Sequence, residues 1–336
     1  MKVIEMPAEG DAVKAKLICA GVLISGCSGS QSALNPAGAG AEQIARLFWW
    51  MAGGATVIWL VMIALSIYAL HLNPVAHHRQ KSALFIIGGG AIAPTIILTI
   101  LLIYGLNLLP ALLARPPAGT FQIEVEGYQW WWRVRYPTQS GKPVELANEI
   151  RLPRGEPVEF ILTSNDVVHS FWIPSLGGKV DMIPGRTTRL TLHPTKTGHF
   201  RGACAEYCGA SHAYMNFSVD VVEKEEFDEW LAQQSTDRIS PQTESVERGE
   251  ALFLQTGCGA CHTIRGTEAD GKIGPDLTHI GSRSSLGADM FPTNRGNLQK
   301  WIAHVSALKP GVKMPAFRAL KDDEYQTLSN YLEQLK

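Results

Sequence analysis

The sequence has almost no net charge. Its 30 Lys and Arg residues nearly balance 31 Asp and Glu residues over 336 positions, which leaves a formal charge of −1 at pH 7. The acidic residues are spread along the chain rather than gathered in one tract. Proteins that bind nucleic acid through its phosphates carry a strongly basic surface. No such excess of basic residues is present, so we expect no nucleic-acid partner.

Cysteine is scarce as well. The six residues form three close pairs, at positions 19 and 27, 204 and 208, and 258 and 261. Each pair belongs to a different local motif, and no cysteine is left over for the disulfide framework that staples small secreted domains. Metal and cofactor chemistry accounts better for the two later pairs.

Charged residues are missing from two long segments. Residues 47–70 and 82–114 contain no Asp, Glu, Lys or Arg. Each segment exceeds the roughly 20 apolar residues that cross a bilayer as a helix. We predict a membrane anchor over residues 47–114, with transmembrane helices at about 47–71 and 82–109.

Residues 1–26 have the features of an export signal. Lys14 and Lys16 precede an apolar run that is too short to span a membrane. The run ends in Leu-Ile-Ser-Gly-Cys27 and resembles a bacterial lipoprotein cleavage box, which predicts removal of residues 1–26 and a lipid on Cys27. An uncleaved or differently cleaved leader is the alternative. Residues 27–46, rich in small and polar residues, are predicted to form a flexible tether.

Basic residues crowd the short loop between the two predicted helices. They are His71, His77, His78, Arg79 and Lys81. Lys and Arg are retained on the cytoplasmic side of membrane proteins, so we expect this loop in the cytoplasm. The rest of the chain then lies on the outer, periplasmic face of a bacterial cytoplasmic membrane.

After residue 115 the hydrophobic pattern changes to a period of two. The clearest segments are Phe121-Ile123-Val125, Val158-Phe160-Leu162 and Phe217-Val219-Val221. Alternating strands separated by Gly, Pro and Asn predict a half-buried antiparallel sheet, folded as a Greek-key sandwich or barrel over residues 115–222. An amphipathic helix and a polar linker are expected over residues 223–242.

A cluster of soft metal ligands lies in residues 204–215. Cys204, Cys208, His212 and Met215 supply two thiols, an imidazole and a thioether. This combination selects copper over hard cations, and a weak Met ligand beside Cys and His is typical of electron-transfer copper. The cysteine spacing also allows a structural zinc site or a disulfide, but neither would use Met215.

The run Cys-x-Glu-x-Cys-x3-His-x2-Met, with Val-Val-His169-Ser-Phe upstream, resembles the copper A domain of cytochrome c oxidase subunit II. The resemblance implies an all-β cupredoxin fold and a dinuclear copper centre. The implied ligands are the bridging Cys204 and Cys208, the terminal His169 and His212, and the weakly bound Met215 and backbone carbonyl of Glu206. The carboxylate of Glu206 is implied to face a magnesium ion shared with subunit I, with a solvated acid as the alternative.

Two further features bear on this resemblance. The three consecutive tryptophans at 130–132 cannot all face one core, because strand side chains alternate. In the family the first tryptophan of the matching segment receives the electron, which implies that role for Trp130, whereas an aromatic belt at the membrane interface is the alternative. Many family members also carry a glutamate in the second helix, at the mouth of a proton path. Residues 82–114 contain no acid, so that role is assigned to no residue.

The C-terminal part contains Cys258-Gly-Ala-Cys261-His262, which is a c-type haem attachment signature. The thiols bond the haem vinyl groups and the histidine binds iron, whereas a thioredoxin-like pair or a chance match is the alternative. Residues 274–277 and 310–315 resemble loops of class I cytochrome c, in which Met314 is the sixth ligand rather than a plain core residue. We expect an all-α cytochrome c domain at 243–336.

Together the three parts resemble a caa-type oxidase subunit II with a fused cytochrome c. The resemblance implies that an external donor, a cytochrome bc complex or a small cytochrome, reduces the covalent haem c. Electrons then pass to copper A and to the haem of subunit I, where oxygen is reduced to water with proton translocation, in a complex with subunits I and III and membrane lipid. The alternatives are a copper A nitric oxide reductase and a free-standing membrane electron carrier.

Overall fold

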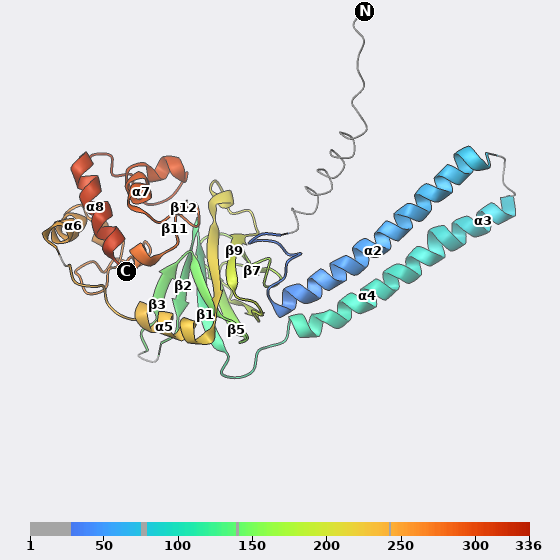
Figure 1. Cartoon of the computed structure of the whole chain (residues 1–336), viewed down its shortest axis with the longest axis horizontal. Helices are drawn as coiled ribbons and strands as arrows, with labels where there is room; N and C mark the ends of the chain where they lie inside the picture. Colours follow the sequence, from blue (N-terminus) through green and yellow to red (C-terminus); the bar gives the residue numbers. More distant parts are fainter. Residues whose placement is uncertain (1–27, 75–78, 139–140, 242) are drawn as a thin grey trace, which may run out of the picture.

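The computed structural model describes residues 28–74, 79–138, 141–241 and 243–336 of the chain. The predicted export signal, the lipid site Cys27, and the loop residues His77 and His78 lie outside the described residues. The described chain has three parts, shown in Figure 1 as a blue and cyan helical hairpin, a green and yellow β-sandwich, and an orange and red helical domain. These parts confirm the predicted fold class.

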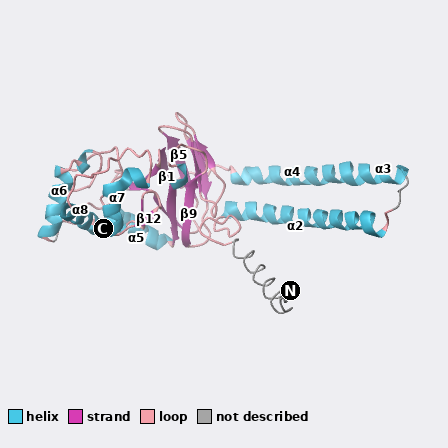
Figure 2. Cartoon of the chain, turned by 90° about the horizontal axis from the view of Figure 1, so that it is seen from above, coloured by secondary structure: helices cyan, strands magenta, loops and turns pink. Residues whose placement is uncertain are grey.

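Two long apolar helical rods run side by side in the hairpin (Figure 2). The first comprises α2 (Ala39–Ile67) and the π-helical turn η1 (Tyr68–Leu72), and the second comprises α3 (Arg79–Ile87), the π-helical turn η2 (Gly88–Ile92) and α4 (Ala93–Leu112). The spans Ala39–Leu72 and Ser82–Leu112 each contain an unburied stretch of 18 residues, with mean hydropathies of 2.1 and 2.3. Both are long and apolar enough to cross a membrane. Pro94 cannot donate a backbone hydrogen bond, and the widened turn η2 lies directly before this interruption.

The segment before α2 differs from the predicted flexible tether. Ala37 is buried, and its N–H donates to the carbonyl of Ser175 in the sandwich at 2.7 Å. A Cβ on Gly38 would lie 2.4 Å from the carbonyl oxygen of Leu176. The small residues that suggested flexibility therefore permit close backbone approach, and helix α2 begins earlier than predicted, at Ala39.

The sandwich consists of two five-stranded sheets. The first has the order β3-β2-β1-β5-β8 and the second the order β4-β10-β9-β6-β7. Their strands are β1 (Phe121–Tyr128), β2 (Trp131–Tyr136), β3 (Val144–Ala147), β4 (Glu149–Pro153), β5 (Val158–Ser164), β6 (His169–Trp172), β7 (Val180–Met182), β8 (Thr188–Leu192), β9 (Gly198–Cys204) and β10 (Asn216–Val222). The prediction of a purely antiparallel sheet was wrong, because β1 pairs with β5, and β4 with β10, in parallel.

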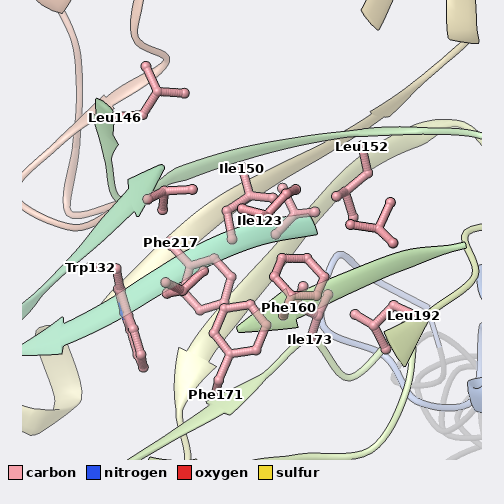
Figure 3. Close-up of a cluster of buried hydrophobic side chains, with 14 of the residues drawn as sticks. Ile123, Trp132, Leu146, Ile150, Leu152, Phe160, Phe171, Ile173, Leu192 and Phe217 are labelled. Carbon is pink, nitrogen blue, oxygen red and sulfur yellow. The ribbon is translucent and has the colours of Figure 1, made fainter. Parts of the chain in front are cut away.

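Aromatic side chains fill the space between the two sheets (Figure 3). The rings of Phe171 and Phe217 stack with centroids 4.9 Å apart, and Phe160 lies 5.0 Å from Phe171. Trp132 contacts this cluster edge-on, and its ring centroid lies 6.0 Å from that of His169. The core therefore continues directly into a predicted metal ligand, which lets packing fix the position of that ligand.

The helix α5 (Lys224–Gln234) follows the sandwich and lies in the segment where an amphipathic helix was predicted. Its buried Phe227 and Trp230 pack on Tyr136, with ring centroids 6.3 and 5.3 Å away. The helical domain follows, with α6 (Glu244–Gln255), η4 (Cys258–Ala260), η5 (Ile280–Ser282), a two-stranded β11 (Ser285–Leu286) and β12 (Phe291–Pro292), α7 (Arg295–Leu308) and α8 (Asp322–Gln334). Where α6 crosses α8, a Cβ on Gly249 would lie 2.5 Å from the Cβ of Tyr331, so glycine permits this close crossing.

Candidate metal centre and haem site

Strand pairing brings the distant His169 to the cysteine loop. Strands β6 and β9 are antiparallel, and Phe171 pairs with Cys204 in their register. His169 begins β6, and the loop after Cys204 returns through η3 (His212–Tyr214) to β10. The N–H of Cys204 donates to the carbonyl of Met215 at 2.9 Å, which closes this loop. The sheet, rather than the local sequence, therefore assembles the site.

The two thiols lie at the centre of the cluster. Cys204 Sγ and Cys208 Sγ are 3.8 Å apart and both cysteines are free, so they do not form the disulfide that the spacing allowed. One ligand atom from each of His169, Cys204 and Cys208 falls in a group within 4.8 Å, and all three residues are buried. Glu206 places its backbone carbonyl oxygen 3.2 Å from Cys204 Sγ.

Each thiol has its own imidazole. His169 Nδ1 lies 3.8 Å from Cys204 Sγ, and His212 Nδ1 lies 3.4 Å from Cys208 Sγ. The thioether of Met215 completes the group, with its Sδ 3.7 Å from Cys208 Sγ. The fold therefore brings together all six residues that the sequence predicted as metal ligands. Structural zinc sites use four ligands. Six candidate ligands, one of them a thioether, therefore fit copper better than zinc.

The thiols also affect each other electrostatically. A hydrogen bond between the two thiols is the main reason that the pKa of Cys204 falls to about 4. The same interaction, followed by burial, raises the pKa of Cys208. Both thiols must lose their protons before both sulfurs can bind metal.

Two residues that the sequence analysis missed hold His169 in place. Asp166 Oδ1 lies 2.8 Å from His169 Nε2, so the Nε2 proton points to the carboxylate and the Nδ1 lone pair faces the thiols. A Cβ on Gly127 would lie 2.8 Å from His169 Cδ2, so only glycine leaves room for the ring. In the sequence, the role of Asp166 was indicated only by its position, three residues before the predicted ligand His169.

The three tryptophans do not all face the core, as their alternation predicted, because Trp130 and Trp132 are buried in it and Trp131 is not. Trp131 stacks on Tyr128 with a centroid distance of 5.1 Å, and Trp132 is fully buried in the core. Trp130 is also buried, and its Nε1–H donates to the backbone carbonyl of Cys208 at 3.0 Å. Gln129, another residue that the sequence analysis missed, donates to the same carbonyl at 2.7 Å. Trp130 and Gln129 therefore both contact the loop that carries the predicted copper ligands.

The haem signature lies at η4, directly after α6. Cys258 and Cys261 are free, and His262 Nδ1 lies 2.8 Å from the carbonyl oxygen of Pro275. This contact places the proton on Nδ1 and leaves Nε2 available to a metal. Burial lowers the pKa of His262, which keeps the imidazole neutral as a ligand must be. A Cβ on Gly274 would lie 2.6 Å from the His262 ring, so the predicted 274–277 loop does pack on this histidine.

Met314 lies half-buried in the loop between α7 and α8. A histidine with one free nitrogen, two free thiols and a methionine in a separate loop are the donors that a covalent haem with His/Met ligation requires. The residues present therefore fit such a group.

Comparison with known proteins gives two family matches. The description "Cytochrome C oxidase subunit II, periplasmic domain" matches residues 138–222, and "Cytochrome c" matches residues 246–336. Cytochrome c oxidase subunit 2 of Alkalihalophilus pseudofirmus is 31% identical over 94% of this chain and 94% of its own length. The corresponding protein of Bacillus sp. strain PS3 is 32% identical over 65% of this chain and 63% of its own length.

Among solved structures, the periplasmic domain of subunit II of cytochrome oxidase from Bradyrhizobium japonicum is 34% identical. It covers 35% of this chain and 95% of its own length, with a TM-score of 0.33.

Proposed function

The chain belongs to the family of cytochrome c oxidase subunit II, and on that premise we propose how its own side chains carry electrons. It is part of a respiratory oxidoreductase complex, with subunit I as its partner and two apolar helices as its membrane anchor. It relays electrons from the haem of its cytochrome domain to copper A and on to subunit I, for the reduction of oxygen coupled to proton translocation.

We assign the copper ligands as the sequence predicted them. Cys204 and Cys208 would together hold two copper ions, His169 and His212 would each hold one, and Met215 and the Glu206 carbonyl would complete the ligand set. The convergence of two thiols, two imidazoles, a thioether and a carbonyl on one spot is the observation that carries this proposal. Six donors exceed what one tetrahedral ion takes.

When bound, the copper pair supplies a centre in which one electron is shared by two metals. The protein's contribution is to hold the ligands still. His169, Cys204, Cys208 and Met215 are all buried, and the hydrogen bond from Cys204 N–H to the Met215 carbonyl ties the loop to β9 and β10. Ligands that cannot move keep reorganisation on electron transfer small.

The cytochrome domain is assigned a covalently attached haem. Cys258 and Cys261 would attach the haem, and His262, through Nε2, and Met314 would hold its iron. With two protein ligands the iron would carry electrons rather than bind oxygen. The domain is therefore an electron carrier, and we place the oxygen-reducing site in another subunit.

Trp130 is assigned as the residue through which electrons reach copper. It is buried, and it donates its indole hydrogen bond to the carbonyl of the bridging residue Cys208. The path from the indole to the copper ligand therefore runs through one hydrogen bond and the backbone of that ligand.

Further partners are inferred from exposed groups and from orientation. Glu206 has an exposed side chain, and a carboxylate suits a magnesium ion completed by ligands from subunit I. The basic loop is placed in the cytoplasm, and the copper and cytochrome domains on the periplasmic side. Subunit III, membrane lipid, and a cytochrome bc complex or small cytochrome as donor complete the proposal.

Purification of the complex in mild detergent tests this function. We expect a large subunit to copurify, with oxygen uptake that depends on electron donor and negligible nitric oxide consumption. The variant Cys208→Ser, which removes a copper ligand, should lose oxygen uptake from the donor while haem remains attached to the chain. Consumption of nitric oxide instead of oxygen, or the absence of a large subunit, would contradict the proposal.

A further inference from the structure

The cytochrome domain lies beside the sandwich (Figure 1). Residues 309–312, which follow α7, contact the loop that carries the predicted copper ligands. Lys309 is 2% exposed, and its Nζ donates at 2.8 Å to the carbonyls of Tyr214, in the metal loop, and Gly287, in its own domain. Burying an amine is costly unless its donors are satisfied. Here the Tyr214 carbonyl belongs to the other domain, so undocking would remove one of these two acceptors from the amine.

The next residues of the segment also contact the copper domain. The carbonyl of Pro310 accepts a hydrogen bond of 2.7 Å from Ser211 Oγ, one residue before the copper ligand His212. Val312 packs against the hydrophobic core of the sandwich. These contacts occur just before the haem ligand Met314, so the loop that carries this ligand is anchored to the loop that carries the copper ligands.

Gly311 packs closely against Trp130 of the copper domain. Its φ is +85°, and a Cβ there would lie 2.6 Å from Trp130 Cη2. The backbone of Gly311 therefore rests directly on the indole, which is only 7% exposed. Any larger residue would push the methionine loop away from Trp130.

A second contact holds the histidine side of the haem site. Arg133, a buried residue of β2, forms an ion pair with Glu145 at 3.1 Å. Its Nη2 donates at 2.6 Å to the carbonyl of Lys272. Lys272 lies two residues before Gly274, which packs on His262. The copper domain thus contacts both the loop that carries Met314 and the loop that packs on His262.

We propose that residues 309–312 and Arg133 form a docking clamp that fixes the cytochrome domain on the copper domain, with the methionine loop covering Trp130. This inference rests on the proposed function. In this arrangement Trp130 receives electrons from the chain's own haem and is closed to a separate donor protein. One electron lost by the haem iron is gained by the copper pair, and no bond forms or breaks. External donors must then deliver their electrons to the cytochrome domain.

The first test uses Gly311→Ala in the intact complex. Hydroxyl-radical footprinting with mass spectrometry measures the oxidation of Trp130 relative to the half-buried Trp172. We expect Trp130 to be protected in the wild type and several-fold more oxidised in the variant. Haem-to-copper transfer after rapid haem reduction should slow on the order of tenfold or more, because small displacements of a reacting group have large effects on rate.

The matched control is Gly155→Ala. Gly155 has a φ of +82°, but no heavy atom lies within 4 Å of its added Cβ, so this variant carries the same backbone strain without the clash. It should behave as the wild type in both measurements. The docking clamp would be overturned if Trp130 in the wild type were oxidised as rapidly as an exposed tryptophan. It would also be overturned if the two alanine variants behaved alike.

Two further pairs of variants keep the test independent of Gly311. Lys309→Met should expose Trp130 and slow transfer, whereas Lys300→Met, at an exposed lysine of α7, should do neither. Arg133→Lys should slow transfer, whereas Arg135→Lys, which shares the Glu145 ion pair, should not. Absence of copper from the wild type would contradict the proposed function, and the footprint would still decide whether the domains are docked.

Discussion

The copper loop and the haem site are built in opposite ways. His169, Cys208, Cys204 and Met215 are between 0% and 7% exposed, and their donor atoms already converge. The haem residues lie on loops and short turns and are only half-buried; they are Cys258, Cys261, His262 and Met314. The polypeptide alone therefore brings the copper ligands together, whereas the haem residues are arranged to surround a large apolar group.

The difference follows from the size of the cofactors. Two metal ions occupy little volume, so the aromatic core of the sandwich reaches the ligands without help. A haem is as large as several side chains, and a domain built around it lacks part of its core without it. Copper should therefore be dispensable for the fold of its domain, and haem should be essential for the fold of the other.

The largest expected effect comes from removing haem attachment. The double variant Cys258→Ser/Cys261→Ser should leave the cytochrome domain without haem and without most of its stability. Limited proteolysis should then degrade the region after α5 rapidly while the sandwich remains intact. If the cytochrome domain of this variant resisted the protease as well as the wild type does, haem would not be essential for its fold. The proposed difference between the two sites would then be wrong.

Loss of a copper ligand should have a confined effect. Cys204→Ser should abolish the absorption of the copper centre and reduce copper bound to this chain to background, because one bridging sulfur is lost. The haem bands and the thermal unfolding of the sandwich should change little, since the aromatic core does not depend on the thiol. Copper absorption is the readout, and its survival in the variant would exclude Cys204 as a ligand.

A smaller effect is expected at Asp166, which orients His169 without binding metal. Asp166→Asn should weaken copper binding by about 10-fold to 100-fold, the range observed for groups that hold a metal-binding histidine. Titration with a competing chelator measures this change. Asp228→Asn is the control, because its carboxylate pairs with the exposed Lys224 on α5. Equal copper affinity in both variants would show that Asp166 does not position the ligand.

The smallest effect concerns the helix crossing in the cytochrome domain. Gly249→Ala should destabilise that domain by about 1–3 kcal/mol, because the added methyl group would overlap Tyr331. Chemical denaturation followed through the haem absorption measures this loss, and the unfolding of the sandwich should not shift. If the denaturation midpoint measured by haem absorption did not change, α6 and α8 would accommodate the methyl group without loss of stability.

Most of the candidate ligands could be proposed from the sequence because soft donors at short spacing are visible in a single segment. Cys204, Cys208, His212 and Met215 lie within one loop, whereas His169 and the carbonyl of Glu206 were placed by the resemblance. The groups that support them were harder to predict. Asp166 and Gln129 reach the site through side-chain directions that depend on how separate strands pack, and a sequence pattern does not contain that information.

The fold shows the same division. Alternation identified β1, β5 and β10, but it does not distinguish parallel from antiparallel neighbours, so the pairing of β1 with β5 was not foreseen. Small residues before α2 suggested a tether, yet Gly38 is required for contact with the sandwich. The docking clamp around Gly311 was likewise invisible, because a glycine in a loop gives no sign of what rests on it.

The most direct test of the relay is the order of electron transfer in the intact complex. After rapid reduction of the haem c, absorption changes should show one electron leaving that haem and arriving at copper A before any haem of subunit I is reduced. The rate should not depend on ionic strength, because the domains are already docked. Reduction of subunit I without prior reduction of copper, or a transfer rate that falls steeply with salt, would contradict the account.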